Sequence, residues 1–441
     1  MKAGGGLFSA AYGLPALWLI VFLVCVLGFS SASPPHALLL AALGVAGLVV
    51  AWRFHQGTLA RLWKQFGWIW LVYILVGCGI FSAELMARPV GAAGFWRLLG
   101  PQAGLVTCLP ALSVFLTLPR VPLAVGTVLC ALCLWHFFAV PLEAVSGLRI
   151  GWLNYEVVVR EFGWLKYQSA GLSSHPYLFA GFYLPAFYLA WGWAHQTWSP
   201  SNQWVASRSM AWLPWLWLLP AACLQSRSAF MGALIASSLC TVGVWRQAGP
   251  ARQLAHSDDA SKAQPIGAFG LVNRRFWLIA LTLFLLILAL SAWFLTLQNK
   301  TGLDLRSAYW QLYWSEAMRW PDVLIGHGFL NDRHHLAVPG LPYIWHSHND
   351  LLEILYSWGA ITLVPYLMFA AALVQLLFRA WQRDVVWLPA AALCVLPTMV
   401  TDLGFHHYEK AVLFTLLAAW CIAQESAINT TARTESRICA K

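Results

Sequence analysis

The sequence predicts an all-α, polytopic integral membrane protein with about twelve transmembrane helices. Two observations predict this class. Hydrophobic residues make up 60% of the 441-residue chain and charged residues only 10%, well below the roughly 25% typical of soluble domains. Apolar runs that approach spanning length also recur throughout the chain, so we interpret residues 1–441 as a single membrane domain.

A helix needs about 20 largely apolar residues to cross a bilayer. The segments that meet or approach this length are 14–31, 37–52, 67–85, 103–118, 121–140, 176–194, 211–225, 229–245, 276–297, 356–378, 385–401 and 411–424. Because their number is even, both termini are expected on the same side of the membrane.

The placement of Lys and Arg predicts that both termini are cytoplasmic, because basic residues concentrate in cytoplasmic loops. The inside loop 246–275 shows this most clearly, with Arg246, Arg252, Lys262, Arg274 and Arg275. The excess of 27 basic over 17 acidic residues therefore reflects topology. No basic run with interleaved aromatic residues forms a face for nucleic acid, so no nucleic-acid partner is expected.

This orientation leaves two large loops outside, 141–175 and 298–350. Within the second loop, residues Ser307 to Trp320 have the pattern of an amphipathic helix lying along the membrane surface. Its apolar stripe consists of Trp310, Tyr313, Trp314 and Ala317. Pro321 and the glycines that follow it end this helix.

The second outside loop ends in a polar cluster, Tyr343 to Asp350, directly before the apolar segment Leu351–Leu377. Polar groups beside lipid are costly, so a dense cluster at this depth is a functional candidate. His346 and His348 are two residues apart and point to different sides, so only one need face a pocket. A neutral imidazole accepts a hydroxyl proton without a metal, and Asp350 or another carboxylate would orient the ring.

Two other interpretations of this cluster stay open. In the first, the histidines are an interfacial pair bonded to the backbone. In the second, they bind zinc together with other histidines of the chain, namely His327, His334, His335, His406 and His407. No HExxH motif occurs, no cysteine accompanies these residues, and their spacing fits no familiar ligand set. We therefore expect no metal and no other cofactor.

Two arginines on the outer side are candidates for binding an anion. Arg227 lies between two apolar runs, where a simple hairpin would contain Gly, Pro or Asn, and Arg306 opens the surface helix. A guanidinium presents donors in a fork that suits phosphate. Plainer roles stay open, as a snorkelling side chain for Arg227 and a solvated loop cation for Arg306. Two arginines and a base beside lipid suit a lipid-linked pyrophosphate substrate.

Around these residues the chain resembles the O-antigen ligase family of bacterial envelope glycosyltransferases, which includes O-antigen polymerases and protein O-oligosaccharyltransferases. The family pattern is His followed by Asn, Ser or Gln, nine residues, Gly and, three further on, a small residue or Tyr. His348-Asn349, Asp350 to Trp358, Gly359 and Thr362 match this pattern completely.

Two further features carry the resemblance, which covers about residues 170–365. The order Arg306, Trp310, Trp314, Pro321, Gly326, Gly328 is similar to that of the family's outside loop. A second family pattern is Arg, three residues and Leu after a spanning segment. Arg227 fits this pattern, but Met231 replaces the leucine.

The resemblance implies a GT-C-like glycosyltransferase of the bacterial inner membrane, in which 141–175 and 298–350 are periplasmic loops. It moves a glycan from undecaprenyl pyrophosphate to an acceptor hydroxyl, with inversion and without metal. His348 would be the catalytic base, and Arg227 and Arg306 would hold the pyrophosphate. Supporting roles are expected for His346, Asn349, Arg160, Lys166 and His175.

Within the family we favour an O-antigen ligase of lipopolysaccharide biosynthesis with lipid A–core as acceptor, because the chain length fits a ligase without the extra outside domain of some protein-modifying members. An O-antigen polymerase or a pilin-glycosylating transferase would show the same three residues. From another class, a flippase or transporter of lipid-linked glycans would need charges at mid-membrane and broken helices. The clearest charge cluster lies at the outer mouth instead. A non-catalytic scaffold would leave the histidine cluster unexplained.

Overall fold

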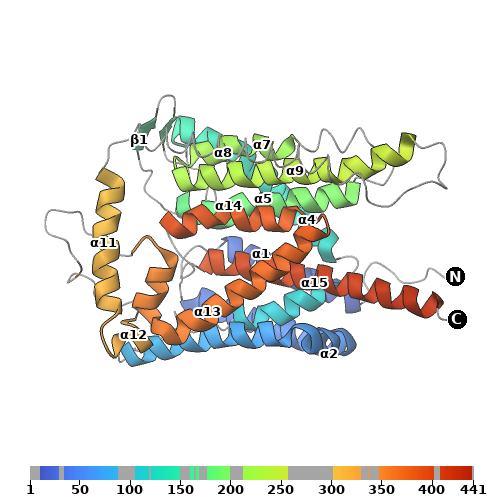
Figure 1. Ribbon diagram of the computed structural model, residues 1–441, viewed down its shortest axis with the longest axis horizontal. Helices are drawn as coiled ribbons and strands as arrows, with labels where there is room; N and C mark the ends of the chain where they lie inside the picture. Colours follow the sequence, from blue (N-terminus) through green and yellow to red (C-terminus); the bar gives the residue numbers. More distant parts are fainter. Residues whose placement is uncertain are drawn as a thin grey trace.

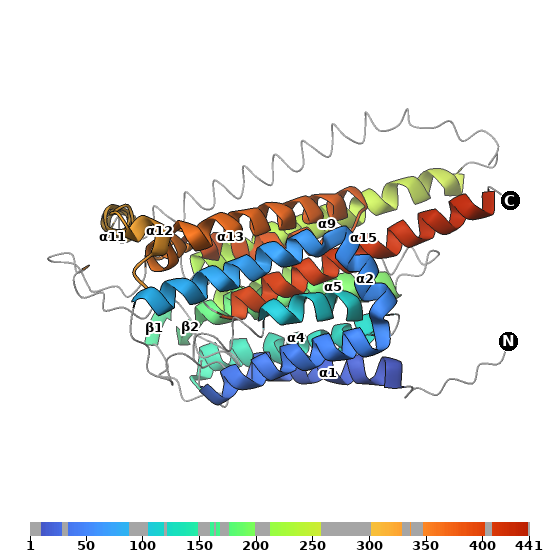
Figure 2. The same cartoon turned by 90° about the horizontal axis from the view of Figure 1, so that it is seen from below.

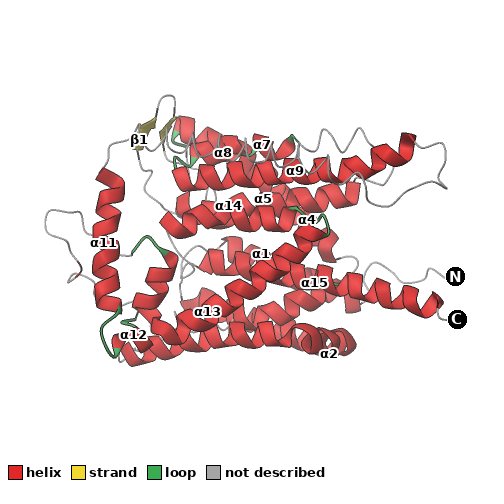
Figure 3. Ribbon diagram, in the orientation of Figure 1, coloured by secondary structure: helices red, strands yellow, loops and turns green. Residues whose placement is uncertain are grey.

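The computed structural model describes residues 10–28, 34–87, 105–118, 121–148, 159–162, 165–167, 176–198, 212–256, 301–328, 336, 347–401 and 408–439. Nearly all of these residues lie in helices, and the strands among them form one two-stranded hairpin (Figure 3). The predicted all-α class is confirmed for this part of the chain.

The elements follow one another along the chain with these bounds: α1 Ala10–Gly28, α2 Pro34–Ala87, α4 Val121–Ser146, β1 Val159–Phe162, β2 Leu165–Tyr167, α5 Pro176–Trp198, α7 Leu213–Leu216, α8 Leu218–Cys223, α9 Arg227–His256, α11 Thr301–Ala317, α12 Asp322–Ile325, α13 Asp350–Gln382, α14 Trp387–Thr401 and α15 Tyr408–Cys439. A further apolar helix, Leu105–Phe115, precedes α4.

Three helical stretches of the described chain are long and apolar enough to cross a membrane: Ala41–Met86, Val125–Ser146 and Asp350–Gln382. Shorter apolar helices accompany them, and together with the composition they indicate a membrane protein. The first of these stretches lies in α2, which joins the predicted spans 37–52 and 67–85 across a non-helical residue, His55. The predicted span 276–297 lies outside the described residues.

Most helices run along one common direction, and α11 lies across one end of them (Figure 1). The chain direction of each helix follows from its contacts. A short turn reverses the chain from α13 into α14. Gly232 of α9 packs against Cys394, and Gly243 packs against Val386, so α9 is antiparallel to α14 and parallel to α13. The first turns of α9 and α13 therefore share one end, called here the α11 end.

The remaining long helices place further chain ends there. Tyr73 of α2 stacks on Phe369 of α13 at 4.6 Å, and Trp358 donates a hydrogen bond to Glu84, so α2 is antiparallel to α13. The last turn of α2 consequently reaches the α11 end. The hairpin β1–β2 lies at that end as well (Figure 1).

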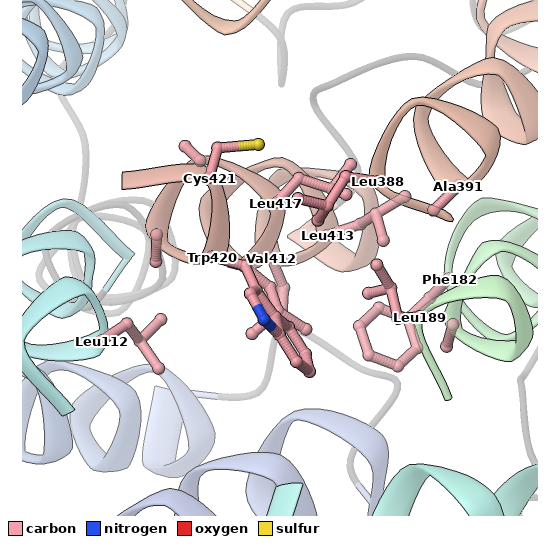
Figure 4. Packing of buried hydrophobic residues seen from close by; sticks show 14 of the residues in the cluster. Leu112, Phe182, Leu189, Leu388, Ala391, Val412, Leu413, Leu417, Trp420 and Cys421 are labelled. Atoms are coloured by element: carbon pink, nitrogen blue, oxygen red, sulfur yellow. The ribbon is translucent and has the colours of Figure 1, made fainter. Parts of the chain in front are cut away.

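The core of the bundle is apolar and draws on helices that are distant in sequence. Leu112, Phe182 of α5, Leu388 of α14 and Trp420 of α15 are all buried in one cluster (Figure 4). Glycines allow the closest helix approaches, since a Cβ at Gly192 would overlap the Trp387 side chain. Close packing through small residues is the usual means of associating helices in lipid, where helix contacts bury no additional apolar surface from water.

The helix α13 is broken at Gly359, which has φ 64° and ψ −174°. The break frees backbone carbonyls of the preceding turn, and two of them find new donors. His327 N–H donates to Tyr356 O at 2.9 Å, and Gly328 N–H donates to Ser357 O at 2.8 Å. The segment after α12 thus satisfies groups that would otherwise be buried without partners. The break divides α13 into a first segment, residues 350–358, and a long second segment.

Replacing Gly359 with alanine should lower stability by at least about 2 kcal/mol, because this φ/ψ region is essentially confined to glycine. The added Cβ would also collide with the backbone at Leu324. The melting temperature of the purified protein in detergent measures this effect. Gly57→Ala is the matched control, since a Cβ there meets nothing within 4 Å. Equal melting temperatures for the two variants would contradict the role assigned to the break.

Candidate active site

His348 lies at the α11 end, in a tight turn directly before α13. It is half-buried, and its φ of 53° places it in the left-handed region. Non-glycine residues adopt this conformation rarely, and histidine, asparagine and aspartate do so more often than others. Residues held in sparsely populated backbone conformations cluster at functional sites. The next residue, Asn349, is extended and caps α13 by accepting a hydrogen bond from Leu352 N–H at 3.1 Å.

Ser347, the residue before His348, is bonded through all of its polar groups. Its N–H donates to Glu353 Oε2 at 2.8 Å, and its carbonyl accepts from Trp310 Nε1 at 2.7 Å. Its hydroxyl donates to the carbonyl of Asn349 at 2.8 Å and accepts from the N–H of Asn349 at 3.3 Å. These bonds, which we call the Ser347 hub, fix the backbone on both sides of His348.

Glu353 anchors the hub from the first segment of α13. Its side chain is buried, and its second oxygen accepts from Ser357 Oγ at 3.0 Å. A buried charge is costly unless hydrogen bonds compensate it, and here both oxygens have donors. The position near the helix N-terminus adds a favourable interaction with the helix dipole. Glu353 therefore holds the N–H of Ser347 with a charge-assisted bond.

Two more buried carboxylates surround this end of α13. Asp350 accepts a hydrogen bond from Tyr366 Oη at 3.1 Å, so it also ties the first segment to the second across the break. Glu84, at the end of α2, accepts from Trp358 Nε1 at 2.8 Å. The first bond crosses the break at Gly359, and the second joins the first segment of α13 to α2. The broken region is therefore held by polar contacts as well as by packing.

Helix α11 reaches the hub through Trp310 and rests on the first segment of α13. Tyr313 and Tyr356 pack edge to face at 4.8 Å, within a small apolar cluster that also contains Ala317, Leu336, Leu352 and Leu355. The sequence predicts one apolar stripe along the membrane surface for this helix. In the structure, Tyr313 and Ala317 cover α13, and Trp314 is 55% exposed. The reason is that Leu352, Leu355 and Tyr356 of α13 bury this part of the stripe.

Arg227 is the first residue of α9, directly after the capping residue Ser226, whose hydroxyl accepts from Ala229 N–H. Gln225 has a φ of 50° and donates from Nε2 to the carbonyl of Tyr167 at 3.2 Å. Tyr167 in turn lies over Gly147, where a Cβ would overlap its ring. The turn before Arg227 is thus joined to the hairpin and to the end of α4. The side chain of Arg227 itself lies outside the described residues.

The other predicted site residues have these positions. Arg306 lies on α11, one turn before Trp310, and Arg160 and Lys166 lie on β1 and β2, which pair in antiparallel fashion. The side chains of these three residues are outside the described part. His346 and His175 also fall outside the described residues. The described backbone brings the positions of His348, Arg306 and Arg227 to the same end of the bundle (Figures 1 and 2).

Sequence reasoning included Ser347 in the polar cluster Tyr343 to Asp350 without giving it a role, and it missed Glu353 and Glu84 as parts of this site. One signal was available for Glu84, because it is the first acidic residue of the chain and ends an apolar run. Glu353 carried a weaker signal, as an acid in the first turns of an apolar helix that begins with an Asn cap. The hydrogen bond from Ser347 N–H to Glu353 joins residues six positions apart, across the turn before α13. No helical spacing rule predicts such a bond.

The described residues contain no group of three or more His, Cys, Asp or Glu side chains that could hold a metal ion. Among them, the site offers an imidazole, buried carboxylates engaged as hydrogen-bond acceptors, and backbone turns that begin two helices. Because an imidazole can accept or donate a proton near neutral pH, His348 is the candidate proton-transfer group of this end.

Comparison with known proteins does not place the chain in a family. No protein-family model matches the chain, and no curated protein matches its sequence.

Loss of the Ser347 hydroxyl should loosen the turn around His348. We expect Ser347→Ala to speed hydrogen–deuterium exchange in a peptide covering residues 347–353, because the N–H of Asn349 loses its acceptor. Ser315→Ala is the control, since its exposed hydroxyl bonds only its own helix, at Leu312 O. An unchanged exchange rate in Ser347→Ala would show that the hub does not order this turn.

Proposed function

We propose that this chain is a membrane glycosyltransferase of the O-antigen ligase type. It transfers a glycan from undecaprenyl pyrophosphate to a hydroxyl of the acceptor, with inversion and without metal. The observation that supports the proposal is the Ser347 hub, which fixes the backbone around His348 at the end of the bundle where Arg227 and Arg306 also lie. The proposal includes a twelve-span topology with both termini cytoplasmic and the α11 end in the periplasm.

In the proposed reaction, the oxygen of the acceptor hydroxyl bonds to the anomeric carbon of the donor, and His348 accepts the proton of that hydroxyl. The bond from that carbon to the pyrophosphate oxygen breaks, and undecaprenyl pyrophosphate leaves with the electron pair. Arg227 and Arg306 hold the pyrophosphate and offset the negative charge that develops on it. Because pyrophosphate is already a good leaving group, holding it and activating the hydroxyl are the main tasks.

The resemblance to the ligase family gains support from the structural roles of its pattern residues. Asn349 caps α13, and Gly359 adopts a conformation that other residues avoid. Thr362 packs where a Cβ on Gly79 would collide with it, so a small residue permits the close contact of α13 and α2. Each pattern position thus has a physical reason near His348.

We assign the remaining candidates to the sugar side of the site. Arg160 and Lys166 share the hairpin that Tyr167 joins to the turn before Arg227. Together with His175, His346 and Asn349 they contact glycan or acceptor in this proposal. The acceptor we favour is lipid A–core; a pilin or a second donor molecule are the alternatives that the experiment below separates.

His348→Ala should abolish glycan transfer while the protein still inserts and binds donor, because the base is lost and the pyrophosphate contacts remain. Arg227→Ala and Arg306→Ala should chiefly weaken donor use, and Lys at either position should restore it poorly, since a fork becomes a point charge. The measurement is transfer by reconstituted protein from a lipid-linked oligosaccharide to lipid A–core, a pilin or a second donor. Normal transfer by all three alanine variants would refute the proposal.

Trp310→Phe should lower kcat for transfer several-fold with little change in donor KM. The indole bond to the Ser347 carbonyl is lost, which costs about 1 kcal/mol, while the aromatic packing remains. Trp314→Phe is a matched control on the same helix, because Trp314 is 55% exposed. If the two variants change kcat equally, Trp310 does not position His348.

A further inference from the structure

A short part of α2 contains basic residues and has no Asp or Glu near it in the sequence. Residues 52–64, called here the crossing segment, contain Arg53, Arg61 and Lys64. No Asp or Glu occurs in the chain before Glu84. The segment therefore brings three positive charges into a region with no acidic residue nearby in sequence.

The crossing segment lies at the end of the bundle opposite α11. It contains the kink at His55, and Figure 2 shows α2 turning across this end before it runs back along the bundle. The antiparallel packing of α2 on α13 agrees, since Tyr73 meets Phe369 and the earlier residues of α2 lie further toward the end of α13. A helical segment that crosses the end of a transmembrane bundle lies at the depth of the lipid headgroups.

Aromatic side chains flank the cations of this segment and are exposed. Trp52 is 64% exposed, Phe54 is 42% exposed and Trp63 is 49% exposed. Trp63 has a defined place, because its indole lies over Gly67 and 5.8 Å from the ring of Trp70. Exposed indoles beside Arg or Lys are typical of a membrane interface, where the ring meets the acyl boundary and the cation meets the headgroups.

The described carboxylates at this end are already engaged by other arginines. Glu425 accepts hydrogen bonds from both terminal nitrogens of Arg383 and lies 3.6 Å from Arg379. Asp384 lies 3.2 Å from Arg246, which also stacks over Trp381. Among the described residues, Arg53 and Lys64 form no ion pair, and both are exposed. Counted over the described residues alone, this end has an excess of positive charge centred on the crossing segment.

We propose that the crossing segment is a binding site for the phosphate headgroups of anionic phospholipid. Arg53 and Lys64 hold the phosphate, and the indoles of Trp52 and Trp63 lie at the level of the headgroups. A cation near an anionic bilayer surface gains about 1 kcal/mol, which corresponds to about fivefold in affinity. The site is at the opposite end from His348 and does not depend on the proposed glycosyl transfer.

The test is lipid binding by the full-length protein, purified in detergent and measured by native mass spectrometry and by melting temperature. Phosphatidylglycerol should bind and raise the melting temperature, whereas phosphatidylcholine should do so far less. Arg53→Gln and Lys64→Gln should each weaken phosphatidylglycerol binding about fivefold, and the double variant about thirtyfold. Higher salt should reduce binding to the wild-type protein.

Three controls separate this site from general charge and from free anions. Arg53→Lys keeps the charge, so this variant should bind phosphatidylglycerol as the wild type does. Arg319→Gln removes an exposed cation away from the crossing segment, one that is paired with Glu316, and should also leave phosphatidylglycerol binding unchanged. Inorganic phosphate at the same concentration should give no comparable stabilisation. Equal binding of both lipids, equal binding by the double variant, or full stabilisation by phosphate alone would each overturn the proposal.

Discussion

At Gly359 the backbone of α13 leaves helical geometry, and the carbonyls of Tyr356 and Ser357 turn to His327 and Gly328 instead of the next helical turn. In a membrane protein this is a demanding constraint, because a backbone group without a partner in a nonpolar environment costs several kcal/mol. The break persists because another part of the chain supplies donors at the required positions. The rest of the site depends on it, since the first segment of α13 can only take its own direction if the helix is interrupted.

The polar groups around the break follow from the same constraint. Burying Glu353, Asp350 and Glu84 carries a desolvation cost, so each needs donors to remain there. The donors that the structure provides are the Ser347 amide and Ser357 hydroxyl, the Tyr366 hydroxyl and the Trp358 indole. Every one of these bonds ends in the first segment of α13 or the turn before it. A purely structural helix end could use one Asn cap and apolar packing, so this concentration of buried acids indicates a region whose geometry is specified beyond the needs of folding.

Much of the helical framework could be predicted from the sequence, because apolar runs and their length are local signals. The cap at Asn349 was also readable, as an Asn directly before an apolar helix. The bond between Glu84 and Trp358 was not, since the two residues are 274 positions apart and no spacing rule joins them. The predicted surface helix corresponds to α11, but part of its apolar face packs against α13. Hydrophobic periodicity shows that a helix has an apolar face, and it does not show what that face contacts. The kink in α2 falls at His55, a residue type that does not predict a kink, whereas Pro or Gly would.

The small apolar cluster beneath α11 joins α11 to the first segment of α13, and Ile354 and Trp358 of that segment also belong to the main core. We call α11, α12 and this segment the α11 unit. This unit carries His348 and the position of Arg306, whereas Arg227 begins α9 of the bundle. A pyrophosphate held by both arginines, as proposed, would therefore bridge the unit and the bundle. In the proposed reaction, the bond from Trp310 to the carbonyl of Ser347 would connect Arg306 on α11 to the residue next to His348. The group that holds the leaving pyrophosphate and the base that activates the acceptor hydroxyl would therefore share one rigid set of contacts.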